Sequence, residues 1–189
     1  MRKKILFLAG MMACCSLAGA QEISKTWVAD KGNGTYQNPV LHADYSDPDV
    51  CAAGDDFYMT ASSFNCIPGI PILHSNDLVN WSLVNYALPI QEPEEFFDKA
   101  QHGKGVWAPA IRFHNGEFYI YWGDPDYGIY MIKAKDPKGR WSKPVLVKAG
   151  KGMIDPTPLW DEDGKVYLVH AYAGSRSGVN SIVVICELN

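Results

Sequence analysis

Short apolar segments separated by turn residues run along most of the chain, and one pattern of them recurs three times. Each repeat begins at a dipeptide that ends in proline, and an apolar strand, a turn and a second strand with tyrosine follow. The dipeptides are Asp47-Pro48, Ala108-Pro109 and Asp155-Pro156, and the tyrosine comes 10, 10 and 11 positions after the proline, at Tyr58, Tyr119 and Tyr167. The turns have the composition of hairpin loops: Gly54-Asp55-Asp56, His114-Asn115-Gly116 and Asp161 to Gly164. The pattern predicts a β-hairpin in each repeat.

Two repeats continue with a third apolar strand and a turn that carries Asp and then Trp. The strands are Ile70 to His74 and Gly128 to Ile132, and the tryptophans are Trp81 and Trp141. The third repeat has a third strand, Ser181 to Cys186, but the sequence ends before its tryptophan. Four strands per repeat, at intervals of 109 − 48 = 61 and 156 − 109 = 47 residues, are typical of propeller blades, which run about 40 to 50 residues. The sequence therefore predicts an all-β propeller represented by two blades and part of a third. The charged insertion Gln91 to Asp98 is expected to be a solvated loop.

The first twenty residues have the features of a secretory signal. A basic start (Arg2, Lys3, Lys4) precedes an apolar run and the small residues Ala18-Gly19-Ala20. The apolar run is shorter than the about 20 residues that a membrane span needs. Cys14 offers an alternative lipoprotein signal, for which Met11 is a poor match. We expect residues 1–20 to be a signal peptide, 21–35 a linker and 36–189 the partial propeller, in an exported protein that is periplasmic or extracellular.

Charge and composition exclude several classes of protein. Without the first twenty residues, 14 basic residues face 21 acidic ones, so the formal charge moves from −4 to −7. Because binding to phosphates needs a basic stripe, a nucleic-acid partner is disfavoured. The histidines have no metal-binding spacing, and the remaining cysteines form no framework: Cys51, Cys66 and Cys186. We interpret these cysteines as buried small hydrophobes or at most one disulfide.

Candidate chemistry follows from the repeat. In a propeller the innermost strands run beside the axis, so Asp47, Asp155 and the segment Trp107 to Pro109 would converge on one cavity. Two carboxylates and an aromatic wall are the equipment of sugar hydrolysis. An Asp before Pro also commonly caps a turn, and Trp commonly packs in a core, so these positions alone leave a structural interpretation open. Asp49, Asp55 and Asp56 are interpreted as solvated turn groups.

At these residues the chain resembles glycoside hydrolase family 43, in its β-xylosidase and α-L-arabinofuranosidase branch. Five motifs carry the resemblance, which extends from Tyr36 to the last residue: Tyr45 to Val50, Gly54 to Phe64, Leu73 to Trp81, Val106 to Ala110 and Asp155 to Leu159. The resemblance implies a five-bladed β-propeller, an inverting mechanism and a xylo- or arabino-oligosaccharide substrate. It names no cofactor and does not define whether calcium occupies the channel.

The resemblance also implies roles for individual residues. Asp47 would be the general base, Asp155 would tune the pKa of the general acid, and Trp107 and Phe64 would line the pocket for the terminal sugar. The general acid of the family is a glutamate in a Glu-Gly-Pro motif, which this sequence does not contain. Glu187 lacks that motif. We therefore expect the chain to be an N-terminal fragment with little activity alone.

Two other functions stay open at this point. A non-catalytic carbohydrate-binding propeller would keep the aromatic pocket but would not need Asp47 and Asp155 together, so the presence of both favours an enzyme. A retaining propeller glycosidase that acts on fructosides would differ in the stereochemistry of the released sugar. The choice between xylose and arabinofuranose, the oligomeric state and a following β-sandwich domain are not defined by the sequence.

Overall fold

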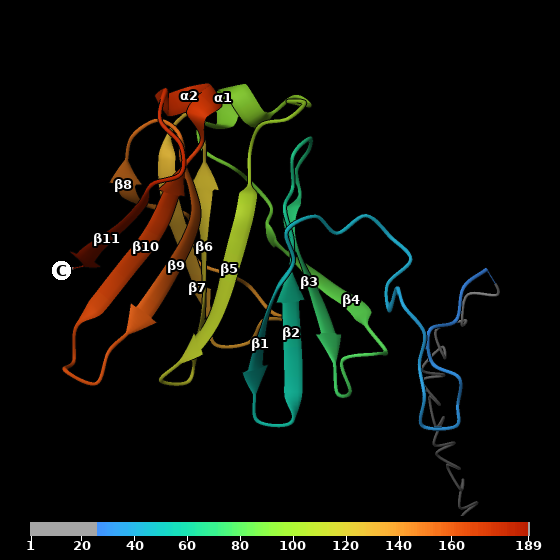
Figure 1. Cartoon of the computed structure of the whole chain (residues 1–189). Coiled ribbons are helices and arrows are strands. Elements are labelled where there is room, and N and C mark those ends of the chain that lie inside the picture. Colours follow the sequence, from blue (N-terminus) through green and yellow to red (C-terminus); the bar gives the residue numbers. More distant parts are fainter. Residues whose placement is uncertain (1–25, 189) are drawn as a thin grey trace, which may run out of the picture.

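Three antiparallel sheets, one for each repeat, follow one another along the chain in the computed structural model, which describes residues 26–188 (Figure 1). The first sheet contains β1 (Asp49–Ala53), β2 (Asp56–Thr60), β3 (Gly69–Ser75) and β4 (Ser82–Leu88). The second contains β5 (Trp107–His114), β6 (Glu117–Asp124), β7 (Gly128–Ala134) and β8 (Val145–Ala149). The third contains β9 (Met153–Trp160), β10 (Val166–Tyr172) and β11 (Val183–Leu188). Within each sheet the strands lie in chain order, so each repeat forms one meander.

The three hairpins predicted from the repeat are confirmed. They close at the pairs Ala53↔Asp56, His114↔Glu117 and Trp160↔Val166. Each turn contains a glycine with a positive φ, 64° at Gly54, 79° at Gly116 and 83° at Gly164. Because a side chain disfavours this left-handed conformation, glycine is the residue that fits these turns at least cost.

The Asp and Trp turns of the first two repeats also have equivalent structures. The indole N–H of Trp81 donates to the carbonyl oxygen of Leu78 (3.0 Å), and that of Trp141 donates to the carbonyl oxygen of Pro137 (3.2 Å). These turns follow β3 and β7, which cover the third strands expected for the two repeats. In the third repeat the third strand, β11, begins at Val183, two residues later than expected.

The interpretation of residues 91–98 as a solvated loop is wrong, because the segment contains a helix and two buried side chains. Glu94–Phe97 form a short helix, α1, and the side chains of Gln91 and Phe97 are buried. The Gln91 amide donates to Asp124 Oδ2 (3.0 Å), and Phe97 packs edge-on against Phe96 with ring centroids 4.9 Å apart. The glutamates between Gln91 and Phe97 are exposed. Their charges indicated a solvated segment, although two other side chains of the same segment are buried.

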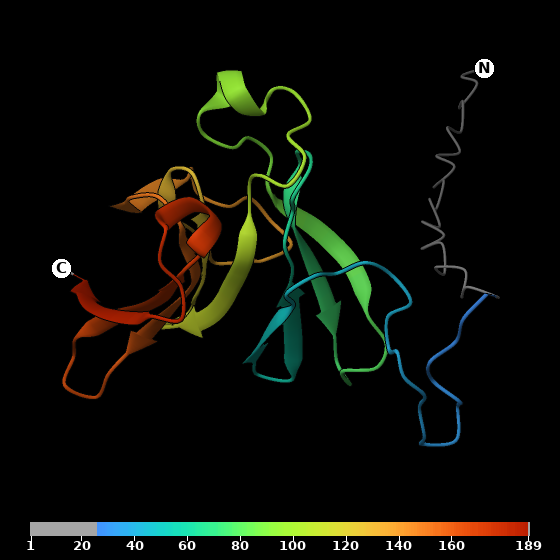
Figure 2. The same cartoon turned by 45° about the horizontal axis from the view of Figure 1, so that its top comes forward.

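The first strands of neighbouring sheets lie against each other. β1 lies against β5 and β5 against β9, and the three sheets stand side by side in both views (Figures 1 and 2). A core of apolar side chains joins the first two sheets, with Ile70 and Ile72 on one side and Ile111 and Trp122 on the other. A smaller cluster joins the second and third sheets: Tyr121, Ile129, Met153 and Leu168.

The described part of the N-terminal segment packs on the first sheet. The Trp27 indole donates to the carbonyl oxygen of Pro39 (2.8 Å), and the Asn80 amide donates to Asp30 (2.9 Å). The signal peptide expected at residues 1–20 lies outside the described residues. Across residues 26–188, no helix has the length and apolar character needed to cross a membrane.

Candidate active site

The first strands of the three sheets, β1, β5 and β9, are called the inner strands below. They run in the same direction, and β5 and β9 begin toward the end that carries α1 and α2 (Gly174–Ser177) (Figure 1). The residue before each repeat's proline lies at or near the start of its inner strand, and all three have a left-handed backbone. Their φ angles are 50° at Asp47, 39° at Ala108 and 54° at Asp155. Such angles cost about 1–3 kcal/mol for residues other than glycine, and they cluster at functional sites. The repeat thus places three strained residues, two of them carboxylates, at one end of the sheets.

Two serine hydroxyls bind the carboxylate of Asp47. Ser62 donates to Asp47 Oδ2 over 2.7 Å, and Ser46 reaches the same oxygen over 3.2 Å. The Ser62 oxygen itself accepts the backbone N–H of Ala108 (2.9 Å). Asp47 is exposed, so its carboxylate is open to solvent as well as anchored. Its partners come from Ser46 and from the segment after β2, which argues against the purely structural interpretation of the Asp-Pro motif.

Asp155 occupies the equivalent position in the third repeat. Desolvation raises the pKa of the Asp155 carboxyl above its usual value, and the negative charge of Asp47 raises it further. The charge of Asp47 acts on Asp155, so these carboxylates of the first and third repeats lie near enough to interact. The two acids predicted from the sequence are therefore brought together.

Trp107 and Phe64 form an aromatic wall beside them. The two rings meet edge-to-face, with centroids 6.2 Å apart and planes at 82°, and both residues are half-buried rather than enclosed in the core. The guanidinium of Arg176, on α2, lies 5.8 Å from the Trp107 ring centroid and its Nε lies 3.2 Å from Asp126 Oδ1. The Trp107 indole nitrogen is buried and has no hydrogen-bond partner among the described residues. A half-buried aromatic pair of this kind is suited to contact with a sugar ring.

A set of interacting polar side chains connects all three inner strands, and the sequence did not predict it. Asp49, in β1, pairs with the Arg112 guanidinium and accepts the Ile111 N–H (2.7 Å), both in β5. Arg112 Nη2 lies 3.4 Å from the hydroxyl of Thr157 in β9. The interpretation of Asp49 as a solvated turn group is therefore wrong, because β1 already begins at this residue. Strand alternation counted from Asp47 could not have revealed this role, because β1 begins only at Asp49 and Asp47 has a left-handed φ.

Of the other two carboxylates interpreted as turn groups, one is confirmed. Asp55 is exposed in the β1–β2 turn. Asp56 instead binds His74 and the Asn76 amide (2.9 Å), and the hydrogen bond from His74 lowers the pKa of the Asp56 carboxyl. Glu187 lies in β11, as expected, and pairs with Lys165, just before β10 (2.9 Å).

The three described cysteines, Cys51, Cys66 and Cys186, are free. Cys51 is half-buried, and burial raises the pKa of its thiol to about 12. Cys66 is exposed, so its interpretation as a buried hydrophobe is wrong. Within residues 26–188, no group of three or more His, Cys, Asp or Glu side chains is arranged to hold a metal ion.

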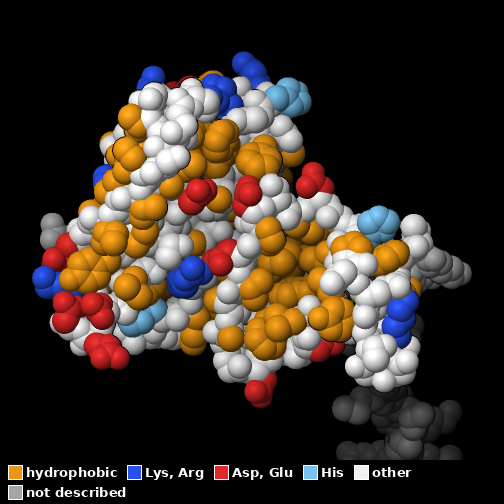
Figure 3. All heavy atoms as spheres, in the orientation of Figure 1, with side chains coloured by type: hydrophobic (Ala, Val, Ile, Leu, Met, Phe, Trp, Pro, Cys, Tyr) orange, Lys and Arg blue, Asp and Glu red, His pale blue; other side chains and the backbone are white. Residues whose placement is uncertain are grey.

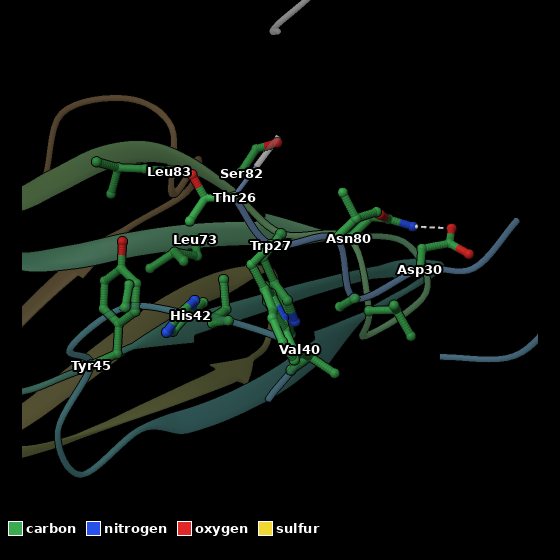
Figure 4. A pocket seen from close by; sticks show the side chains of 16 residues that line it. Thr26, Trp27, Asp30, Val40, His42, Tyr45, Leu73, Asn80, Ser82 and Leu83 are labelled. Atoms are coloured by element: carbon green, nitrogen blue, oxygen red, sulfur yellow. Dashed lines mark hydrogen bonds between the residues drawn. The ribbon is translucent and has the colours of Figure 1, made fainter. Parts of the chain in front are cut away.

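A cavity of about 530 Å³ lies on the outer side of the first sheet, between the N-terminal segment and β3 and β4 (Figure 4). Trp27, His42 and Tyr45 line it, and its single carboxylate, Asp30, is bound by Asn80. Neither Asp47 nor Asp155 belongs to its wall. The cavity therefore lacks the paired acids that mark the end of the inner strands as the candidate active site.

Comparison with known proteins identifies relatives of this chain. The family described as Glycosyl hydrolases family 43 matches residues 36–189. A beta-xylosidase of Formosa agariphila is 36% identical over 87% of this chain and 29% of its own length. A non-reducing end alpha-L-arabinofuranosidase of Bacteroides ovatus is 38% identical over 71% of this chain and 26% of its own length. The crystal structure of a xylan beta-1,4-xylosidase from Bacillus halodurans superimposes with a TM-score of 0.65 at 27% identity, over 81% of this chain and 31% of that one.

The chain therefore belongs to glycosyl hydrolase family 43, and its relatives include xylosidases and arabinofuranosidases. It is similar in fold to enzymes of that family. The chain spans less than a third of the length of these relatives, with coverages of 29% and 26% for the two sequences and 31% for the structure.

Proposed function

We propose that this chain forms the N-terminal part of the catalytic domain of an inverting glycoside hydrolase. Its substrates are oligosaccharides or polysaccharides of the plant cell wall, from which it releases terminal xylose or arabinofuranose. The observation that carries the proposal is the pair of carboxylates, Asp47 and Asp155, at equivalent strained positions beside the Trp107 and Phe64 rings. The β-xylosidase and arabinofuranosidase relatives support the substrate class.

In the proposed architecture the three sheets are blades of a five-bladed propeller. Apolar side chains gather over the first sheet and over β10 and β11 on the face shown in Figure 3. The exposed large apolar residues of the third sheet are Leu159, Val183 and Ile185, at 52%, 69% and 66% exposure. Because open apolar faces of this kind are normally covered, they support packing against further sheets.

In the proposed mechanism Asp47 is the general base. It accepts a proton from the water that attacks the anomeric carbon, while a separate acid protonates the leaving oxygen on the other face of the sugar. An inverting enzyme holds the two groups about 6.5–9.5 Å apart. Asp155 orients the acid and tunes its pKa, and Trp107 and Phe64 pack on the sugar. The acid itself is a glutamate outside this chain, in a Glu-Gly-Pro motif.

The proposal predicts that residues 1–189 alone hydrolyse glycosides poorly. General acid catalysis is typically worth about 10² to 10⁴-fold, and the base cannot replace it. Release of xylose from xylobiose, whose sugar leaving group needs an acid to depart, measures this, with a complete family member as the reference. Turnover by the chain that matches the reference would contradict the assignment of the acid to a missing segment.

The stereochemistry of the reaction separates this proposal from a retaining glycosidase that acts on fructosides. NMR of the sugar freshly released by the complete protein should show the inverted anomer.

The basic, apolar and small-residue pattern of residues 1–20 supports export to the periplasm or the medium. N-terminal sequencing of the mature protein tests this, and a mature chain that begins near Gln21 is expected.

A further inference from the structure

Ser62 lies at the point where the first and second sheets meet beside Asp47. It follows β2, and its own N–H donates to the carbonyl oxygen of Ser46 (3.0 Å). The next residue, Ser63, exchanges two backbone hydrogen bonds with Val106, of 3.0 and 3.1 Å. The backbone of Ser62 and Ser63 is therefore held between the residue before Asp47 and the residue before Trp107.

The hydrogen bonds of the Ser62 side chain have a fixed direction. Its oxygen accepts the N–H of Ala108 (2.9 Å), and a backbone N–H can only donate. A hydroxyl has a single proton, and that proton goes to Asp47 Oδ2 over 2.7 Å. A donor aimed at a carboxylate favours its ionised form, and hydrogen bonds to a charged group are stronger than neutral ones.

The second repeat supplies this N–H because of an irregularity in β5. The register between β5 and β6 shifts between Trp107 and Ala110, so Ala108 does not donate into the regular ladder. Pro109 has no N–H, and Ala108 has the left-handed φ of 39°. A bulge of this kind re-aims backbone groups next to active sites. The second repeat thus contributes a backbone donor where the first and third contribute carboxylates.

We propose that Ser62 is a positioning residue for the catalytic base. The hydrogen bonds given to this carboxylate by residues 26–188 both end on Oδ2, which leaves Oδ1 to receive the proton of the attacking water. The chain from the Ala108 N–H through Ser62 to Asp47 fixes the rotation of the carboxylate. The inference rests on the proposed function, since it takes Asp47 to be the base.

The first test compares variants of the complete protein that includes the general acid. Ser62→Ala is expected to lower kcat about ten- to a hundred-fold, the range for losing a hydrogen bond to a charged group, with KM within about three-fold. Ser62→Thr keeps the hydroxyl and is expected to restore kcat to within about three-fold of the wild type. The matched control is Ser142→Ala, because Ser142 accepts the Lys133 N–H (3.0 Å) but donates to the Lys143 carbonyl oxygen (3.1 Å). It should keep full activity.

The outcomes separate the two proposals when Asp47→Ala is measured in parallel. An inactive Asp47→Ala together with a fully active Ser62→Ala would overturn the positioning role and leave the base in place. An active Asp47→Ala would overturn the proposed function itself. A Ser62→Thr variant as impaired as Ser62→Ala would also overturn the role, because the hydroxyl would then not be what matters.

The second test needs no activity and uses the complete protein. Amide hydrogen exchange at Ala108 should be at least about ten-fold faster in Ser62→Ala than in the wild type or in Ser62→Thr. The Ile111 amide, which donates to Asp49, is the internal control and should be unchanged. Unchanged protection at Ala108 would overturn the relay. If both amides lose protection, Ser62→Cys, which keeps the size but is a weak donor, replaces Ser62→Ala with the same expectations.

Discussion

At the scale of single residues, Asp124 is a buried acid that the candidate active site does not use. It ends β6 and is 1% exposed. Its carboxylate accepts the Asp126 N–H (3.0 Å) and the Gln91 amide (3.0 Å), but burial outweighs these bonds and raises the pKa of Asp124 to about 6. The Gln91 oxygen beside it is buried without a hydrogen-bond partner among the described residues. A neutral group at position 124 would suit this site better than a charge.

Asp124→Asn is therefore expected to stabilise the protein at neutral pH. The folded state binds the proton of Asp124 more tightly than the unfolded state, so this group's contribution to stability is present below pH 4 and is lost as the pH rises through 6. The loss is at most about 3 kcal/mol for a shift of about two pKa units. In the variant the introduced amide can also donate to the Gln91 oxygen after that side chain turns over. Urea unfolding at pH 4 and pH 7.5 measures the difference. Asp163→Asn, in the exposed β9–β10 turn, is the control, and equal pH dependence in wild type and Asp124→Asn would contradict the account.

At the scale of elements, β6 and β9 approach each other closely where the second and third sheets meet. A Cβ on Gly123, in β6, would lie 2.6 Å from the Met153 carbonyl oxygen and 3.1 Å from the Ile154 Cα. These are backbone atoms, so they can move away only if a strand shifts. The absence of a side chain at Gly123 thus sets the distance between the two sheets.

Gly123→Ala should lower the free energy of unfolding by about 1–3 kcal/mol, as over-packed positions do. Gly139→Ala is the matched control, because its added Cβ would meet nothing closer than the Asp136 carbonyl oxygen at 3.4 Å. Thermal unfolding of both variants measures the difference. Equal stability of Gly123→Ala and Gly139→Ala would show that the sheets are not held at this spacing.

The elements also show what the sequence could predict. The strands and hairpins were predictable because apolar segments, turn glycines and tyrosines recur at fixed intervals. Helix α1 was not, because Glu94 and Glu95 indicate solvent while Phe97 is buried behind them. Asp47 and Asp155 could be named from the repeat. Ser62 could not, because its role depends on the Ala108 N–H that a bulge sets free, and no side-chain pattern records a bulge.

At the scale of the whole molecule, the three sheets place the candidate site residues at one end and exposed apolar side chains at the side. Asp47 and Asp155 come from the first and third sheets, and the second sheet supplies Trp107 between them in the chain. The arrangement brings two carboxylates near each other, while exposed Val183 and Ile185 support the packing of further sheets in the proposed architecture. In the proposed enzyme those sheets carry the general acid.

The most direct measurement is hydrolysis of 4-nitrophenyl β-xyloside and α-L-arabinofuranoside by the complete protein with Asp47→Ala. A good leaving group departs without an acid, but water still needs a base, so kcat is expected to fall by about 10² to 10⁴-fold on such substrates. Asp55→Ala, in the exposed turn between β1 and β2, should keep full activity. Activity of Asp47→Ala comparable to that of Asp55→Ala would remove Asp47 from the role of base and contradict the account.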